Sequence, residues 1–169
     1  MKRSIQCLHR SLALTGLAVV LGLFTSCQSS QEVDVPESAI SKVDYFHLKS
    51  ASTRRESQDP MIYSESAYYL HGALTTAERL ARVGNYYTVY WETEDEASPV
   101  TVQFFYRQAN SGSDVKTLEK VYDSHDGDGA AKFAIIGDDY AKSGRVISWK
   151  ATVQQNGAEI GSQTSFLWK

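Results

Sequence analysis

The sequence predicts an all-β protein built as an antiparallel β-sandwich of about seven strands with one short helix. Three observations lead to this prediction. Apolar and polar side chains alternate with a period of two along several short segments, β-branched and aromatic residues are concentrated within them, and turn-forming residues separate them at fairly regular spacing. Once an N-terminal leader is set aside, about 140 residues remain, which suffice for one ordinary domain.

The domain is expected to begin with a strand, a polar break and a second strand. The first strand is predicted over Val43–Leu48, and residues 52–60 form a polar, charged break. The aromatic and apolar residues of Met61–Leu74 predict the second strand. We therefore assign residues 43–169 to the sandwich, with its core over about 61–169.

One helical signal follows the second strand. Thr75 and Glu78 have the spacing of a capping box, in which each side chain binds the backbone of the other residue. Leu80 and Val83 share one face, and Gly84 is expected to close the C-terminus. The sequence thus predicts a helix of about two turns.

Two strands with clear alternation come next. In the segment Tyr86–Glu92, the side chains of Tyr87, Val89 and Trp91 are expected to face the core. A charged tip leads into a strand over 100–107, in which every second residue is apolar. The residues expected to point inward from that strand are Val100, Val102, Phe104 and Tyr106.

Four further strands complete the predicted sandwich. They are Lys116–Tyr122, Lys132–Ile136, a strand marked by Ile147, Trp149, Ala151 and Val153, and Ala158–Trp168. Asn156 and Gly157 both tolerate the positive φ angles of a type I′ turn, so the last two strands are expected to form a hairpin.

The strand order and the inward Trp149 resemble an immunoglobulin-like or fibronectin-type domain over roughly residues 61–169. The chain lacks the Cys…Trp…Cys spacing of antibody domains, so the resemblance is to the architecture in general. The segment Asp138–Tyr140 resembles the corner that precedes a late strand in such sandwiches. In that corner a tyrosine hydroxyl binds the backbone.

The N-terminus has the pattern of an export signal. An apolar run without charges covers Leu12–Phe24, and it is shorter than the roughly 20 residues that a membrane-spanning helix needs. It follows a basic start and precedes a cysteine at position 27. The basic residues are Lys2, Arg3 and Arg10.

Leu23-Phe24-Thr25-Ser26-Cys27 resembles the bacterial lipobox. The resemblance implies that residues 1–26 are a signal peptide, that Cys27 is lipidated, and that residues 27–42 hold the lipidated cysteine and a flexible tether. Acyl chains contribute about 0.8 kcal/mol per buried methylene, so the multiple chains expected on Cys27 would hold the protein stably on a membrane. Gln28 follows the cysteine where enterobacterial lipoproteins retained at the inner membrane tend to have Asp, so the outer membrane is favoured. The alternative is an incidental cysteine after an ordinary secretory signal.

Charge and cysteine content exclude some functions. The signal contains three basic residues and no acidic ones, so 14 basic and 20 acidic residues remain, a formal charge of −6. This charge argues against nucleic acid as a partner. Cys7 lies in the signal and Cys27 is the predicted lipid site, so no disulfide is expected.

The sequence indicates no catalytic site and no cofactor. The histidines lack metal-binding spacing, and no nucleophile elbow or phosphate-binding glycine loop occurs. Asp123, Asp126 and Asp128 lie among glycines and are candidate ligands for Ca²⁺. A solvated turn between two strands is the simpler interpretation of these residues, and we favour it.

Aromatic residues give the best indication of a binding surface. Tyr86, Tyr90 and Phe105 alternate with the expected core residues, so their side chains should point outward. They either pair across strands and lie beneath other segments, or form an exposed surface. The sequence therefore predicts a non-catalytic, lipid-anchored envelope protein whose domain binds another envelope protein. The alternative is a protein that binds carbohydrate or peptidoglycan through exposed Tyr or Trp residues.

Overall fold

The computed structural model describes residues 39–52 and 59–169, which lie in a compact unit spanning Glu37–Lys169. These residues form seven strands, as expected, and three helices where the sequence predicts one. In chain order the elements are β1 (Ile40–Leu48), α1 (Pro60–Leu70), α2 (Thr76–Leu80), β2 (Gly84–Glu92), β3 (Val100–Gln108), β4 (Lys116–Tyr122), β5 (Asp128–Ile136), α3 (Gly137–Ser143), β6 (Val146–Gln155) and β7 (Ala158–Thr164).

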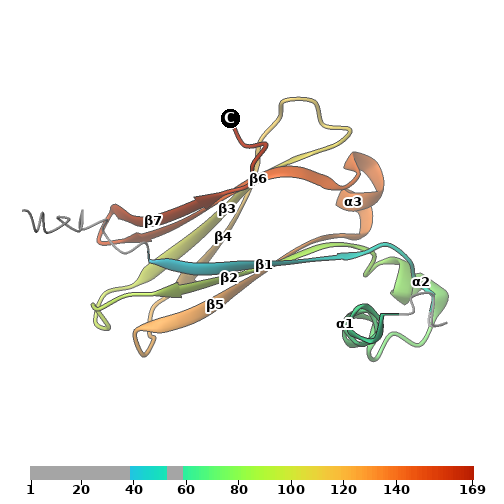
Figure 1. Cartoon of the computed structure of the whole chain (residues 1–169), viewed down its shortest axis with the longest axis horizontal. Coiled ribbons are helices and arrows are strands. Elements are labelled where there is room, and N and C mark those ends of the chain that lie inside the picture. The colour runs from blue at the N-terminus through green and yellow to red at the C-terminus, as the bar shows by residue number, and fades with distance from the viewer. Residues whose placement is uncertain (1–38, 53–58) are drawn as a thin grey trace, which may run out of the picture. The chain divides into compact units, whose positions relative to one another are not determined.

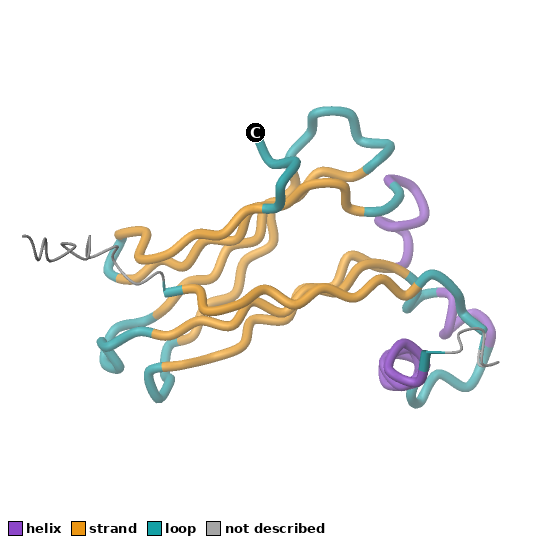
Figure 2. Tube along the Cα trace, viewed as in Figure 1, coloured by secondary structure: helices purple, strands orange, loops and turns teal. Residues whose placement is uncertain are grey.

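The strands form two antiparallel sheets that pack face to face (Figures 1 and 2). One sheet has the order β1-β2-β5 and the other the order β4-β3-β6-β7. The chain changes sheet between β2 and β3, between β4 and β5, and between β5 and β6. This is the antiparallel, immunoglobulin-like β-sandwich that the sequence predicts.

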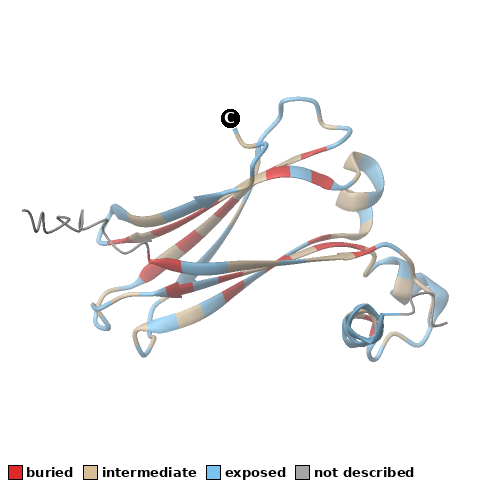
Figure 3. Ribbon diagram, viewed as in Figure 1, coloured by how far each residue is buried: buried red, intermediate tan, exposed pale blue. Residues whose placement is uncertain are grey.

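The hydrophobic core lies between the sheets, and buried residues alternate with more exposed ones along β2 and β3 (Figure 3). Phe104 lies within this core, where its ring packs against Tyr87, Phe133 and Trp149. Because the core cluster comes from residues of the unit Glu37–Lys169, that unit has a core of its own. The residues of β2 and β3 that were predicted to point inward are all buried, namely Tyr87, Val89, Trp91, Val100, Val102, Phe104 and Tyr106. Trp149 of β6 is partly buried and packs against the core.

The first strand extends further than predicted. β1 begins at Ile40 instead of Val43, and Ile40 is part of the core. Ile40 pairs with Trp91 of β2, and the backbone N–H of Ala39 donates to the carbonyl of Ile160 in β7. The core therefore includes residues well before position 61.

The strand predicted over Met61–Leu74 is wrong, because the helix α1 occupies most of this segment. Asp59 caps the helix by accepting a hydrogen bond from the backbone N–H of Met61 at 2.9 Å. Pro60 lies in the first turn, where its missing N–H costs no hydrogen bond. All residues of α1 are described, and among them Leu70 alone is buried. The helix therefore lies against the sandwich without entering its main core.

The helix α2 confirms the predicted capping box. The Thr75 hydroxyl accepts a hydrogen bond from the Glu78 backbone at 3.2 Å, and the Glu78 carboxylate accepts one from the Thr75 backbone at 3.0 Å. Gly84 begins β2 and does not close this helix. Its φ is 151°, and a Cβ atom there would lie 2.2 Å from the carbonyl oxygen of Ile135. Only glycine permits this approach of β2 to β5.

The corner predicted at Asp138–Tyr140 is part of the short helix α3. The hydroxyl of Tyr140 lies 2.7 Å from Nε2 of His47 in β1, so it does not fix the backbone in the way expected. The difference arises because Tyr140 lies on α3 and its hydroxyl reaches a side chain of β1. The contact connects α3 with β1.

The hairpin of β6 and β7 confirms the predicted turn. Asn156 has a φ of 53° and Gly157 a φ of 78°, as a type I′ turn requires. Ile147, however, is exposed, unlike the other apolar residues that mark β6. The register between β3 and β6 shifts between Arg107 and Gln108, which makes Ile147 an extra, outward-pointing residue of a bulge.

Candidate functional site

The three aromatic residues predicted to form one surface lie on two different sheets. Tyr86 and Tyr90 are on the outer face of β2, two positions on either side of Thr88. Phe105 is on the outer face of β3, in the opposite sheet. The structure thus places Tyr86 and Tyr90 on the same outer face and Phe105 on the outer face of the opposite sheet.

A groove of about 1140 Å³ lies between α1 and the outer face of the β1-β2-β5 sheet. We call it the α1 groove. Its lining combines aromatic rings with charged side chains of both signs. The lining includes the side chains of Lys42, Glu65, Tyr68, Tyr69, Tyr86 and Tyr90.

One wall of the α1 groove is a stack of aromatic rings. The ring of Tyr69 on α1 stacks on Tyr86 of β2, with centroids 3.9 Å apart, and on Phe46 of β1, with centroids 5.2 Å apart. The Tyr86 hydroxyl donates a hydrogen bond to the carbonyl of Arg82. Burial raises the pKa of both phenols, so they stay neutral at physiological pH. Tyr86 is therefore covered by Tyr69 and holds α1 in place.

Two other tyrosines leave their rings accessible in the α1 groove. The side chain of Tyr68 is 66% exposed, and that of Tyr90 is 38% exposed. The ammonium of Lys42 lies 5.8 Å from the centroid of the Tyr90 ring and forms an ion pair with Asp44 at 2.7 Å. The groove thus offers flat apolar surfaces next to charged groups that can form hydrogen bonds.

Sequence reasoning missed the α1 side of this groove. Tyr68 and Tyr69 are adjacent in the sequence, and a strand would direct them to opposite faces. In α1 their rings meet edge to face, with centroids 5.2 Å apart. Asp59 followed by Pro60 was the available signal, because this pair is typical of a helix start.

A second cavity, of about 680 Å³, lies on another side of α1. It is lined by the end of β1, including His47 and Leu48, and by α1 residues such as Ile62 and Tyr63. Burial, with smaller effects from Lys49 and Arg145, lowers the pKa of His47. The helix therefore separates two cavities, of which the α1 groove has the larger volume.

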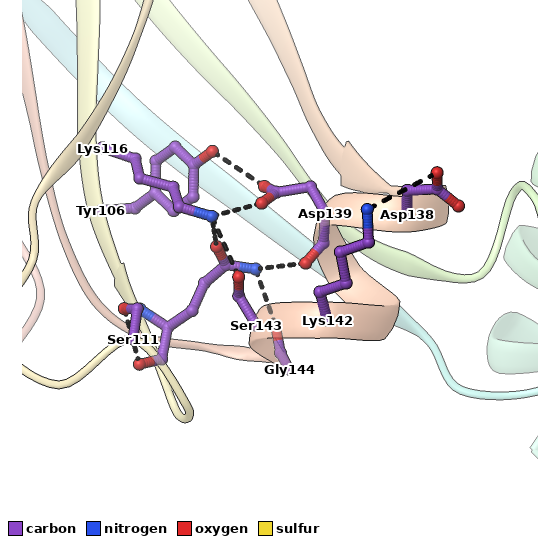
Figure 4. Close-up of polar contacts among 9 residues, drawn as sticks. Tyr106, Ser111, Lys116, Asp138, Asp139, Lys142, Ser143 and Gly144 are labelled. Carbon is purple, nitrogen blue, oxygen red and sulfur yellow. Dashed lines mark hydrogen bonds and ion pairs between the residues drawn. The ribbon is translucent and has the colours of Figure 1, made fainter.

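A polar cluster joins α3 to β3 and β4 (Figure 4). The Lys116 ammonium contacts the Asp139 carboxylate and donates to the Gln108 amide oxygen at 2.8 Å and to the Ser143 hydroxyl at 3.1 Å. The Tyr106 hydroxyl donates to the other Asp139 oxygen at 3.1 Å. Burial, together with the Asp139 charge, raises the pKa of Tyr106 to about 12.

The contacts of the polar cluster fit a structural role. The Lys116 ammonium forms an ion pair with the Asp139 carboxylate. The three protons of that ammonium meet three acceptors, so none is directed at a substrate. Fully buried Gln108 extends the cluster by donating to the carbonyls of Asp139 and Gly144. The cluster therefore fixes α3 on the sandwich.

The candidate calcium ligands lie in and next to the turn between β4 and β5. Asp123 and Asp126 are in the turn, and Asp128 is the first residue of β5. His125 organises this turn, because its Nδ1 accepts a hydrogen bond from the Gly127 backbone at 3.2 Å and its Nε2 contacts the carbonyl of Ser98 at 3.0 Å. Across residues 39–52 and 59–169, no three His, Cys, Asp or Glu side chains gather in a way that could hold a metal ion.

Cys27 lies outside the described residues, as do the signal peptide and most of the predicted tether. In the part of the chain that the structure covers, every helix falls short of the length and apolar character needed to cross a bilayer. Comparisons with known protein families, curated proteins and solved structures find no match to this chain.

Proposed function

We propose that this chain is a non-catalytic, lipid-anchored protein of the bacterial cell envelope that uses its β-sandwich as a binding domain. The lipobox resemblance around Cys27 supports the anchor, and Gln28 favours the outer membrane as its location. The α1 groove is the binding site in this proposal. The observation that carries it is the pair of accessible rings, Tyr68 and Tyr90, contributed by a helix and a sheet to the same groove.

The composition of the α1 groove supports binding to a partner. Aromatic residues are enriched in interfaces because a rigid ring buries a large area at a small entropic cost. Lys42 and Glu65 add charges at the same surface, which allow the groove to select a complementary partner. An envelope protein that inserts an exposed segment into the groove would use both features.

Lipid anchoring is tested by metabolic labelling with a clickable fatty acid. Cells producing the native chain should yield a labelled protein in the membrane fraction. In the Cys27→Ala variant the label should disappear, because the thiol is the acceptor of the lipid. Equal labelling of both chains, or labelling of neither, would contradict the anchor.

The role of the α1 groove is tested by site-specific photocrosslinking in cells. A photoreactive phenylalanine at Tyr68 or Tyr90 should capture a discrete partner. The matched control places the same group at Val121, an exposed residue of β4 in the other sheet. Identical adduct patterns from the groove positions and from Val121 would argue against a groove-specific partner.

Carbohydrate is the second candidate ligand, and the exposure of Tyr68 and Tyr90 favours it. Sugar rings stack on exposed aromatic faces, while neighbouring charged groups bond their hydroxyls. Calorimetric titration with soluble peptidoglycan fragments and a panel of polysaccharides tests this candidate. Binding that weakens about tenfold in Tyr90→Ala would support it. A flat titration for the intact domain across the whole panel would remove it.

A further inference from the structure

The segment after β7 is held in a defined conformation on the outer side of the β4-β3-β6-β7 sheet. The backbone N–H of Ser165 donates to the carbonyl of Trp149 at 2.9 Å, and the Ser165 hydroxyl accepts from the Trp149 backbone at 2.9 Å. These bonds continue the pairing with β6 beyond β7. The chain then turns, because the N–H of Trp168 donates to the carbonyl of Ser165 at 3.0 Å.

Arg107 contacts the last two residues of this segment, Trp168 and Lys169. Its guanidinium carbon lies 4.3 Å from the centroid of the Trp168 ring, and its Nη2 donates to the carbonyl of Lys169 at 3.3 Å. Arg107 is on the outer face of β3, two residues after Phe105. The turn over residues 165–168 is thus attached both to β6 and to β3.

The turn directs two large apolar side chains into solvent. The side chain of Phe166 is 96% exposed and that of Leu167 is 62% exposed. Exposed apolar residues are common singly, but two adjacent large ones next to a tryptophan mark a surface that can contact an apolar partner. We call the set Phe166, Leu167, Trp168, Arg107 and Lys169 the apolar turn.

We propose that the apolar turn contacts the surface of a lipid bilayer. Aromatic and aliphatic side chains next to Lys and Arg are the composition of protein segments that lie in membrane interfaces. The apolar groups enter the boundary of the acyl chains, and the cations remain at the level of the headgroups. This inference rests on the lipid anchor of the proposed function, because the anchor brings the domain to the bilayer.

Size and chain length favour a bilayer over a protein as the occupant. A stable protein interface involves about 20 to 30 residues on each side, far more than this turn offers. A tethered domain needs fewer contact residues, because the tether holds it near the bilayer at an effective concentration of about the millimolar range. The chain from Cys27 to Ala39 spans at most about 40 Å, which keeps the domain close to the surface.

The test attaches the domain to vesicles independently of lipidation. Residues 28–169 contain the whole compact unit and no cysteine, so a single introduced cysteine can carry a fluorescent label. An N-terminal histidine tag binds this fragment to vesicles of phosphatidylethanolamine and phosphatidylglycerol with a nickel-chelating lipid. The label is placed at Leu167→Cys or, as a matched control, at Met61→Cys on α1, which is 74% exposed. Spin-labelled lipids in the same vesicles quench a label that enters the bilayer.

We expect the label at position 167 to be quenched at least about threefold more strongly than the label at position 61. Adding Phe166→Ser to the Leu167→Cys chain should reduce this quenching toward the control level. Equal quenching at the two positions, or quenching unchanged by Phe166→Ser, would overturn the proposal and leave a protein as the remaining occupant. Because the chelating lipid replaces the natural anchor, the outcome does not depend on lipidation of Cys27 or on the α1 groove.

Discussion

The rings of Tyr69 and Tyr86 stack with their centroids 3.9 Å apart, and this contact joins α1 to β2. The neighbouring Tyr68 is mostly exposed in the α1 groove. Two adjacent tyrosines of one helix therefore have separable roles, one in attaching α1 and the other in lining the groove.

We expect Tyr69→Ala to lower the free energy of unfolding by about 1 to 3 kcal/mol, because it removes a stacked, partly buried ring. Tyr68→Ala should change stability by less than about 0.5 kcal/mol, since its ring is mostly in solvent. Urea denaturation followed by circular dichroism measures both values. Equal losses for the two variants would show that the stack does not anchor α1.

Gly129→Ala should destabilise the domain through a steric clash. A Cβ atom at Gly129 would lie 2.5 Å from the indole ring of Trp91, which is buried in the core. Displacing that ring should cost about 1 to 3 kcal/mol. Ala130→Ser, at the next and exposed position of β5, is the matched control. The melting temperatures of both variants are compared with that of the native chain. A Gly129→Ala chain that melts at the native temperature would contradict the predicted clash.

The pair of His47 and Tyr140 predicts a pH dependence of stability. Burial, with contributions from Lys49 and Arg145, lowers the pKa of His47 in the folded protein. As the pH falls below the usual histidine pKa of about 6.5, the unfolded chain takes up this proton before the folded chain does. The free energy of unfolding should therefore decrease from about pH 7 to about pH 5.

The contribution of His47 is isolated by the variant His47→Gln, whose side chain does not titrate. Its unfolding free energy should depend less steeply on pH over that range than that of the native chain. His71→Gln is the control, because it makes the same substitution at a histidine other than the one that contacts Tyr140. Parallel pH profiles for the native chain and His47→Gln would refute the assignment.

The polar cluster predicts an energetic coupling between Lys116 and Asp139. Single variants Lys116→Met and Asp139→Asn each leave the partner with incomplete contacts. In a double-mutant cycle, the coupling energy should be about 1 kcal/mol or more. Lys142→Met with Asp138→Asn is the control cycle, because that exposed pair lies 4.0 Å apart. A coupling no larger than the control would mean that the cluster does not hold α3.

Removal of metal ions should leave stability unchanged. The turn that contains Asp123 and Asp126 is held by hydrogen bonds of His125 to Ser98 and Gly127. We expect the melting temperature to be the same with and without EDTA. A lower melting temperature in EDTA that calcium restores would show that the aspartates bind an ion after all.

Residues with a strictly local signal were predictable from the sequence. The strands β2 and β3 were predictable because their side chains alternate with a period of two. The capping box was predictable from the three-residue spacing of Thr75 and Glu78, and the last hairpin from Asn156 and Gly157. α1 was not predicted, because its tyrosines are typical of strands and because Asp59 and Pro60 are typical of a polar break as well as of a helix start.

The site was only partly predictable, because it depends on contacts between distant segments. The outward direction of Tyr86 and Tyr90 follows from alternation along β2. The strand order alone places Phe105 on the other sheet. The stacking of Tyr69 on Tyr86 depends on the position of α1, which the sequence did not predict. The outward Ile147 results from a bulge whose register local sequence does not set.

β1 and β2 are antiparallel neighbours, and their ladder ends at the pair Leu48 and Gly84. Connections between such strands commonly need about 2 to 5 residues, whereas this one spans residues 49–83 and includes α1 and α2. The pairing of β1 with β2 does not require a connection of this length. Residues 49–83 are therefore an insertion that carries α1 and α2, and changes within it would leave the ladder between β1 and β2 in place.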